Sequence, residues 1–242
     1  MKINFTQILQ DSWNFVRNQS RVVWALVGVL LVVQLVGDLF SVNLPQGATA
    51  QEVREMLNQS EQVYFGAGSL IKQLLFVFAT TFSLACIHFI SQPSIWAKSF
   101  QLAARKIIGV LILDVLILLP LTLSLVQAYI NLGSANVSLF LLLAMAVGIF
   151  IFVRLNLVSV HYLINNVGIL QSLRQIWQLG MKRNLILFGY TVIVYFTVPI
   201  LSASLIALAG NTIMNSLLAV IISFLNVFAL IFTYRFYTLF KG

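Results

Sequence analysis

Six long apolar stretches, from which charged residues are almost absent, constrain this chain more than any other feature. They are Val22–Phe40, Ala67–Ile90, Ile107–Ile130, Val137–Leu163, Leu185–Ala209 and Met214–Tyr237. A helix that crosses the hydrocarbon core of a bilayer needs about 20 mostly apolar residues, and these stretches reach that length. Because the bilayer core offers no water to the backbone, a spanning segment without strand-like alternation has to be helical. The sequence therefore predicts an all-α, polytopic membrane helix bundle with six transmembrane helices, forming one integral membrane domain over residues 1–242.

The composition agrees with this prediction. Apolar residues make up 60% of the 242 positions and charged residues only 8%, whereas a soluble domain carries about 25% charged residues. A net charge of +8 would also suit a nucleic-acid-binding protein, but the basic residues are scattered at the ends of the apolar stretches rather than clustered on one face. We therefore expect membrane lipids as partners, and no nucleic acid.

The basic residues also predict how the chain is oriented. Only Arg54 and Lys72 fall on one side of the predicted membrane. Twelve fall on the other: Lys2, Arg17, Arg21, Lys98, Arg105, Lys106, Arg154, Arg174, Lys182, Arg183, Arg235 and Lys241. Since cytoplasmic loops of membrane proteins carry an excess of Lys and Arg, both termini are expected in the cytoplasm.

The first apolar stretch also allows a different interpretation, a signal peptide cleaved after Ala48-Thr49-Ala50. The stretch is longer than the roughly 7–15 residues of a signal-peptide core, and Asp38 interrupts its end, so we favour an uncleaved span. The segment after it, residues 42–66, is then a periplasmic loop. Its residues Ala50–Gln62 alternate charged and apolar side chains, which predicts a short amphipathic helix.

An amphipathic stretch with one tryptophan precedes each odd-numbered span. Trp13, Trp96 and Trp177 are 83 and 81 residues apart. We predict three pseudo-repeats, at about residues 1–85, 86–166 and 167–242, each made of an interfacial amphipathic helix and a transmembrane hairpin. In each, the tryptophan anchors the helix in the headgroup region. The alternative is coincidence combined with the general preference of tryptophan for membrane interfaces.

Ionisable residues inside membrane spans are the most informative functional pointers in such a protein. Asp114 and Arg154 lie at similar depth in spans three and four, so we predict that they form an ion pair. Asp38 and Lys72, near the outer ends of spans one and two, are expected to pair likewise. Either these charges only fix helix register, which we favour, or Asp114 belongs to a proton or ion relay with His88 or His161.

Two prolines interrupt predicted spans at corresponding places in the second and third units. Pro120 and Pro199 lie 24 and 22 residues after Trp96 and Trp177, and we expect them to kink their helices. Interrupted helices at corresponding positions of repeats also mark binding sites in transporters. Against a catalytic role, the sequence contains no GxxxxGK[ST], HExxH, CxxC or GxSxG motif. Its two histidines and one cysteine lack the spacing of metal ligands.

Short segments along most of the chain resemble a known family. Asp11–Gln19, Arg154-Leu155, Ser172-Leu173-Arg174 with Trp177, and the end of the chain from Asn211 to Tyr237 resemble the YciC-like family of uncharacterised gammaproteobacterial inner-membrane proteins. The resemblance implies location in the bacterial inner membrane and no catalytic site. The middle segment is also similar to a membrane domain found beside some glycerophosphodiester phosphodiesterases, but the phosphodiesterase domain is absent from this sequence.

These observations lead to two main functional hypotheses and a third, a membrane enzyme acting on lipid, which the absence of a nucleophile–base set disfavours. The first is a non-enzymatic multi-pass inner-membrane protein, without cofactor or metal, acting in envelope or lipid homeostasis. The alternative is a transporter or channel for a small or lipidic solute, with a path along the Pro-containing spans and Asp114.

The orientation is testable with reporters fused to each end of the chain. An even number of spans and the excess of basic residues predict that a fluorescent protein matures at both termini and that alkaline phosphatase is inactive there. Phosphatase inserted after Ala50 is expected to be active. Reporters that place the two termini on opposite faces would contradict six spans.

Overall fold

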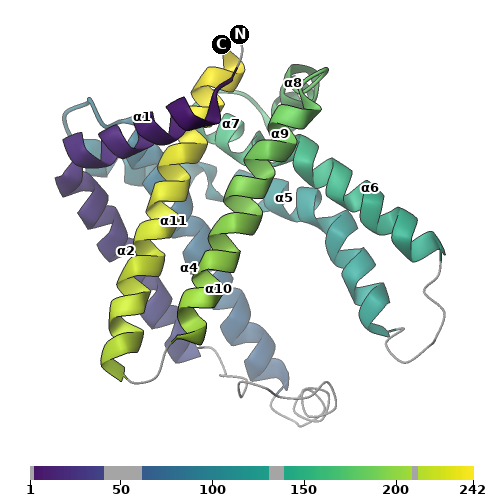
Figure 1. Cartoon of the computed structure of the whole chain (residues 1–242), viewed down its shortest axis with the longest axis horizontal. Coiled ribbons are helices and arrows are strands. Elements are labelled where there is room, and N and C mark those ends of the chain that lie inside the picture. Colours follow the sequence, from purple (N-terminus) through teal and green to yellow (C-terminus); the bar gives the residue numbers. More distant parts are fainter. Residues whose placement is uncertain (1–2, 41–61, 131–138, 209–211) are drawn as a thin grey trace.

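The computed structural model describes residues 3–40, 62–130, 139–208 and 212–242, and these ranges contain helices and no strand (Figure 1). The elements are α1 (Phe5–Asn18), α2 (Ser20–Phe40), α4 (Gln62–His88), α5 (Ile95–Ile130), α6 (Leu139–Leu155), α7 (Val158–Ile164), α8 (Ile169–Leu179), α9 (Asn184–Thr191), the π-helical segment η1 (Val192–Thr197), α10 (Val198–Ala207) and α11 (Thr212–Lys241).

Six parts of the described chain are long and apolar enough to cross a membrane, as the sequence predicts. They are α2, α4, α5, α6 with α7, α9 with η1 and α10, and α11. The span α2 contacts α4, α4 contacts α5, α5 contacts α6, α6 contacts α9, and α10 contacts α11, which returns to α2. Both chain ends lie at the same end of this bundle, near α8 (Figure 1). We call this the terminal end, and the opposite end the far end.

The best-packed part of the bundle is an aromatic cluster near the terminal end. Tyr190 stacks on Phe236 with ring centroids 4.5 Å apart and on Phe232 at 6.4 Å. All three side chains are at most 1% exposed, and the hydroxyl of Tyr190 lies 3.0 Å from that of Thr233. Toward the far end the packing is looser, because α10 has no buried residue. The bundle is therefore held together mainly at the end where both termini lie.

The second predicted amphipathic stretch, Ser94–Lys106, is not a separate helix. It continues into span three as the single 36-residue helix α5. The reason is local. No glycine or proline separates this stretch from the span, and Ala103–Lys106 are strong helix formers. In the other two units the chain turns before the span, and Lys182 adopts a positive φ of 63° between α8 and α9.

The fourth predicted span is one apolar stretch but two helices. Helix α6 ends at Leu155 and α7 begins at Val158. At the break, the side-chain amide of Asn156 donates a 2.6 Å hydrogen bond to the hydroxyl of Thr191 in α9. Because Asn hydrogen-bonds groups outside its own helix more readily than apolar residues do, it is the residue of this stretch best suited to a break.

The fifth span widens into a π-helical turn just before Pro199. A proline has no N–H to bond the carbonyl four residues earlier, here that of Tyr195. The turn over Val192–Thr197 is wound more loosely than an α-helix, and Thr197 Oγ1 donates to the carbonyl oxygen of Val192 at 3.1 Å. Around Pro120, by contrast, α5 remains a continuous helix. Ser124 Oγ bonds the carbonyl oxygen of Pro120 at 2.8 Å.

Two expectations concern residues that the structure does not describe. The predicted amphipathic helix Ala50–Gln62 lies outside the described residues except for Gln62, with which α4 begins. The cleavage site of the alternative that we do not favour, a signal peptide cleaved after Ala50, also lies outside them. Helix α4 begins five residues before the Ala67 boundary that hydropathy predicts.

Gly148 allows α5 and α6 to approach closely. A Cβ atom added there would lie 3.1 Å from both the N and the Cα atoms of Leu121. Backbone atoms inside a helix cannot move aside as a side chain can. Gly28 in α2 is a natural control, since no atom lies within 4 Å of a Cβ added to it.

We predict that Gly148→Ala destabilises the protein by about 1–3 kcal/mol, the usual cost of overpacking. Gly28→Ala is expected to be neutral or to stabilise by up to about 1 kcal/mol, because alanine favours a helix over glycine. Unfolding in mixed detergent micelles, followed by circular dichroism, measures both. Equal stabilities of the two variants would contradict a close α5–α6 contact.

Candidate functional site

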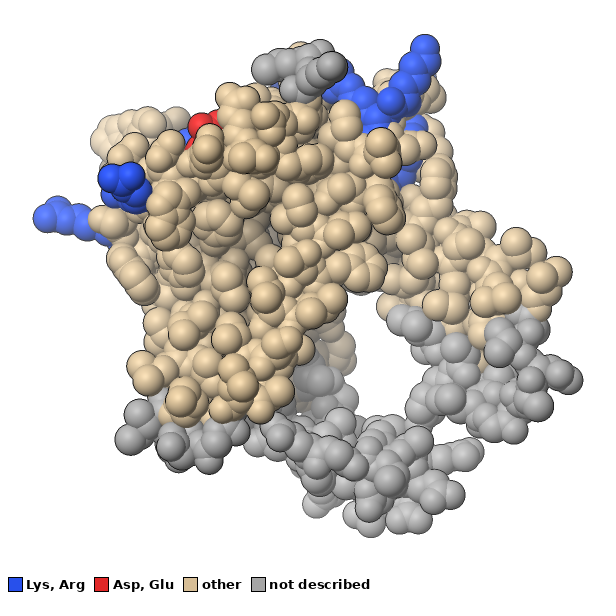
Figure 2. All heavy atoms as spheres, in the orientation of Figure 1, with Lys and Arg blue, Asp and Glu red and all other residues tan. Residues whose placement is uncertain are grey.

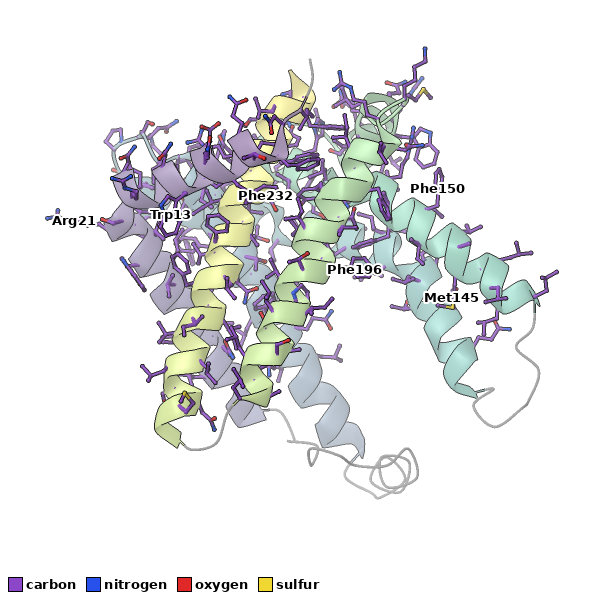
Figure 3. The ribbon with its side chains drawn as sticks, in the orientation of Figure 1. Trp13, Arg21, Met145, Phe150, Phe196 and Phe232 are labelled. Carbon is purple, nitrogen blue, oxygen red and sulfur yellow. The ribbon has the colours of Figure 1, made fainter. Side chains whose placement is uncertain are left out.

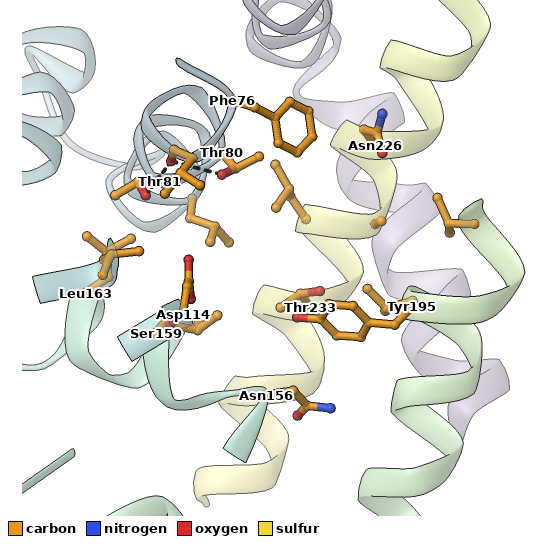
Figure 4. Close-up of a pocket in the computed structure, with 18 of the residues that line it drawn as sticks. Phe76, Thr80, Thr81, Asp114, Asn156, Ser159, Leu163, Tyr195, Asn226 and Thr233 are labelled. Carbon is orange, nitrogen blue, oxygen red and sulfur yellow. Dashed lines mark hydrogen bonds between the residues drawn. The ribbon is translucent and has the colours of Figure 1, made fainter. Parts of the chain in front are cut away.

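A cavity of about 370 Å³ lies between α4, α5, α7, the η1–α10 segment and α11 (Figure 4). Of its nineteen lining residues eleven are apolar and eight are polar. The polar lining residues are Thr80, Thr81, Asp114, Asn156, Ser159, Tyr195, Asn226 and Thr233. Of the two prolines predicted to mark a site, Pro199 lines this cavity and Pro120 does not.

Asp114 is the one carboxyl group among the lining residues. It lies near the middle of α5, between the buried residues Leu113 and Ile117 of the same helix. Ser159 of α7 donates a 2.5 Å hydrogen bond to its Oδ1 atom. Because α7 begins only after the break at Asn156, that break determines where Ser159 lies relative to Asp114.

Two further hollows adjoin the cavity, and each shares residues with it. The α4–α5 groove, of about 280 Å³, is lined by Leu70, Gln73, Leu74, Val77, Leu111, Asp114, Val115, Leu118, Leu119 and Thr122. It shares Asp114 and Val77 with the cavity. The α6–α9 groove, of about 420 Å³, is lined by residues of α5, α6, α9 and η1, among them Phe196 (Figure 3), and shares Tyr195 with the cavity.

The predicted ion pair between Asp114 and Arg154 is wrong. The guanidinium of Arg154 donates to the carbonyl oxygens of Gly180 at 3.0 Å and Trp177 at 2.9 Å, and also to Asn184 Oδ1. It lies 4.7 Å from the centre of the Trp177 ring. Since α6 ends one residue after Arg154, its side chain reaches past the helix to the end of α8. The last carbonyls of a helix lack N–H partners in that helix.

The second predicted pair includes Asp38, whose side chain lies outside the described residues. The side chain of Lys72 packs against α2 at the neighbouring residue, Gly37. A Cβ added at Gly37 would lie 2.7 Å from Lys72 Cγ. The Asp38–Lys72 pair therefore stays a prediction.

Neither histidine lines the cavity. Both instead face tyrosines of α11. His161 Nδ1 lies 2.8 Å from Tyr237 Oη and its Nε2 lies 2.7 Å from Gln175 Oε1, while His88 Nδ1 lies 3.2 Å from Tyr234 Oη. The structure therefore does not bring together the members of the predicted relay with Asp114.

The three tryptophans that are predicted to anchor the repeats follow a common pattern. Each is partly exposed, and its ring contacts a phenylalanine of the second span of another unit. The first unit contacts the third in this way, the second contacts the first, and the third contacts the second. The ring pairs are Trp13 with Phe228 of α11 at 6.5 Å, Trp96 with Phe82 of α4 at 6.2 Å, and Trp177 with Phe150 of α6 at 6.3 Å. Trp13 and Phe150 are labelled in Figure 3.

Sequence reasoning missed Ser159, Tyr195 and Thr233 as lining residues. Single hydroxyl groups within an apolar stretch carry little signal of their own. Tyr195 lies four residues before Pro199, at the carbonyl that the proline leaves without a helical partner, and this spacing was the available clue. Among the described residues no three His, Cys, Asp or Glu side chains gather to hold a metal ion.

Six apolar helical spans define the class: the chain is a multi-pass α-helical membrane protein. It is 40% identical over 245 residues to a protein of Haemophilus influenzae described as an uncharacterized protein, and the alignment covers 99% of each. The chain belongs to the same family as that Haemophilus protein. No family model matches the sequence, and no solved structure matches it.

We predict that Arg154→Ala lowers the free energy of unfolding by about 2–4 kcal/mol, because buried acceptors at the end of α8 lose their donor. Arg154→Lys is expected to recover only part of the loss, since an ammonium lacks the planar fork of a guanidinium. The exposed Arg174 of α8 provides the control, and Arg174→Ala should leave stability unchanged. A melting temperature of Arg154→Ala equal to that of Arg174→Ala would contradict this role.

Proposed function

We propose that the protein is a non-enzymatic, multi-pass protein of the bacterial inner membrane that acts in envelope or lipid homeostasis by binding a lipid-like solute. The observation that carries this proposal is the cavity beside Asp114, with its apolar walls and its two adjoining grooves. Ligand pockets are typically about 300–1,000 Å³ and mostly apolar, with a few polar groups that fix orientation.

The free-energy cost of placing the carboxyl group of Asp114 inside a membrane span supports a functional role for this residue. A carboxyl group inside a membrane span is expensive and is kept where it serves a pathway, a relay or a ligand. Its predicted structural partner, Arg154, is engaged elsewhere. A solute with an apolar body and a polar group fits such a site better than a hydrophilic one.

A binding role is favoured over catalysis by the residues that line the cavity. General acid–base and nucleophilic chemistry most often uses a histidine, or a lysine or second carboxylate, beside the reacting group. Asp114 is the one carboxyl there, and no histidine, lysine, arginine or cysteine joins it.

The inner-membrane location is supported by the family and by the charges. The Haemophilus relative is consistent with the YciC-like resemblance. In Figure 2 the visible Lys and Arg side chains gather toward the terminal end of the bundle. That distribution supports cytoplasmic termini through the positive-inside rule.

The ring contacts of the three tryptophans and the one-sided burial of α1 and α8 support the proposed threefold organisation. Ile8, Ser12 and Phe15 of α1 and Ser172 and Ile176 of α8 are buried, while Trp13 and Trp177 are half-exposed. This one-sided burial suits interfacial helices that rest on the bundle and face headgroups with the rest of their surface.

Transport of the solute is the second candidate. One wall of the cavity is formed by the π-helical segment η1 and by Pro199, which follows it in α10. Single π-helical turns and broken helices are frequent at functional sites, and in transporters they line the substrate path.

A photo-reactive lipid tests the binding proposal. The protein is reconstituted in phospholipid vesicles containing a trace of phospholipid with a mid-chain diazirine, and labelled residues are mapped by mass spectrometry. Labels are expected on the cavity residues Val110 and Leu230. Ala229→Leu, which fills the cavity, should reduce them about tenfold, since extra methylenes in a fitted site cost about 1–3 kcal/mol.

Ala219→Leu is the matched control on the same helix, because Ala219 lines neither the cavity nor its grooves. It should leave labelling unchanged. Labels confined to outward-facing residues, in wild type and both variants alike, would exclude lipid binding in the cavity.

A further inference from the structure

Asp114 stands at a boundary between two hollows. It lines both the central cavity and the α4–α5 groove, and Val77 is the other residue that lines both. In Figure 4 its side chain lies between the Thr81 region of α4 and Ser159 of α7. A molecule that passed from the groove into the cavity would therefore pass this carboxyl group.

The α4–α5 groove faces outward, toward the bilayer. Leu70 of α4 and Val115 of α5, which both line it, are each 60% exposed. Gln73, Asp114 and Thr122 are its polar residues, and the rest are apolar. An outward-facing apolar groove between two spans is accessible to lipid and not to a water-soluble solute.

The carboxyl group has hydrogen-bonding capacity to spare. A carboxylate offers about four acceptor sites, and among the described residues Ser159 Oγ is the one hydrogen-bond donor on it. No Lys, Arg or His lines either hollow. Burying a carboxylate without a cation is costly, so a ligand that supplies a positive charge and N–H donors complements this site best.

We propose that the ligand is a lipid with a primary ammonium headgroup, which enters laterally from the bilayer between α4 and α5 and is held at Asp114. This inference rests on the proposed function and specifies its ligand and route. The ammonium donates to the carboxylate, and the apolar walls of the cavity take up part of the acyl chain. The α6–α9 groove, which lacks a carboxyl group, is not the entrance.

The test uses the full-length protein in vesicles with two photo-reactive lipids that differ only in headgroup. One is a diazirine phosphatidylethanolamine and the other a diazirine phosphatidylglycerol. We expect the ethanolamine lipid to label the cavity residues Val110 and Leu230 about tenfold more strongly, since one charge-assisted hydrogen bond provides that preference. Asp114→Asn should abolish the preference, because it keeps the shape of the side chain and removes its charge.

A pair of variants tests the route. Leu118→Trp narrows the α4–α5 groove without lining the cavity, and Val192→Trp does the same in the α6–α9 groove. Only Leu118→Trp should slow labelling of the cavity by the ethanolamine lipid. This comparison and the wild-type headgroup preference decide the matter even if Asp114→Asn does not fold.

The outcomes separate this inference from the proposed function. Equal cavity labelling by both lipids, unaffected by Asp114→Asn, would overturn the ammonium ligand and leave lipid binding standing. Slower labelling with Val192→Trp instead of Leu118→Trp would overturn the lateral route. Absence of cavity labels with either lipid would remove the proposed function as well.

Discussion

Within a bilayer every backbone N–H and C=O group has to find its partner inside the protein, and the whole structure depends on this requirement. Long helices meet it automatically. Where the helices of this protein stop or loosen, side chains take over. Arg154 bonds the carbonyls of Trp177 and Gly180 at the end of α8, and Thr197 bonds the carbonyl of Val192 in the π-helical turn. The breaks are thus stabilised by specific polar residues of the spans.

The same requirement explains which features could be predicted from the sequence. The six spans follow from apolar length alone, and the boundaries of α2 and α11 lie within four residues of those predicted. Hydropathy does not reveal interruptions within an apolar stretch, so the break at Asn156 escaped prediction, and only Pro199 itself indicated an irregularity in span five. The Asp114–Arg154 pair failed for a different reason. Its premise was similar depth in neighbouring spans, and depth does not determine which way a side chain points; Arg154 points to the end of α8.

The site itself was predictable only in part. Asp114 and Pro199 stand out as a charge and a helix breaker in apolar surroundings, and both line the cavity. Ser159 and Tyr195 reach the cavity through tertiary structure, one from the short helix after the break and the other from the widened turn. The spacing of Tyr195 from Pro199 was a local clue in the sequence, whereas the place of Ser159 depends on a three-dimensional contact that no local pattern records.

The break at Asn156 separates two residues that determine the surroundings of Asp114. Arg154, which precedes the break, hydrogen-bonds the end of α8 and so cannot neutralise the charge of Asp114. Helix α7, which follows the break, places Ser159 where it donates a hydrogen bond to the same carboxyl group. Arg154 thus stabilises the end of α8, and its hydrogen bonds there leave the carboxyl of Asp114 without a cation among the residues that line the cavity.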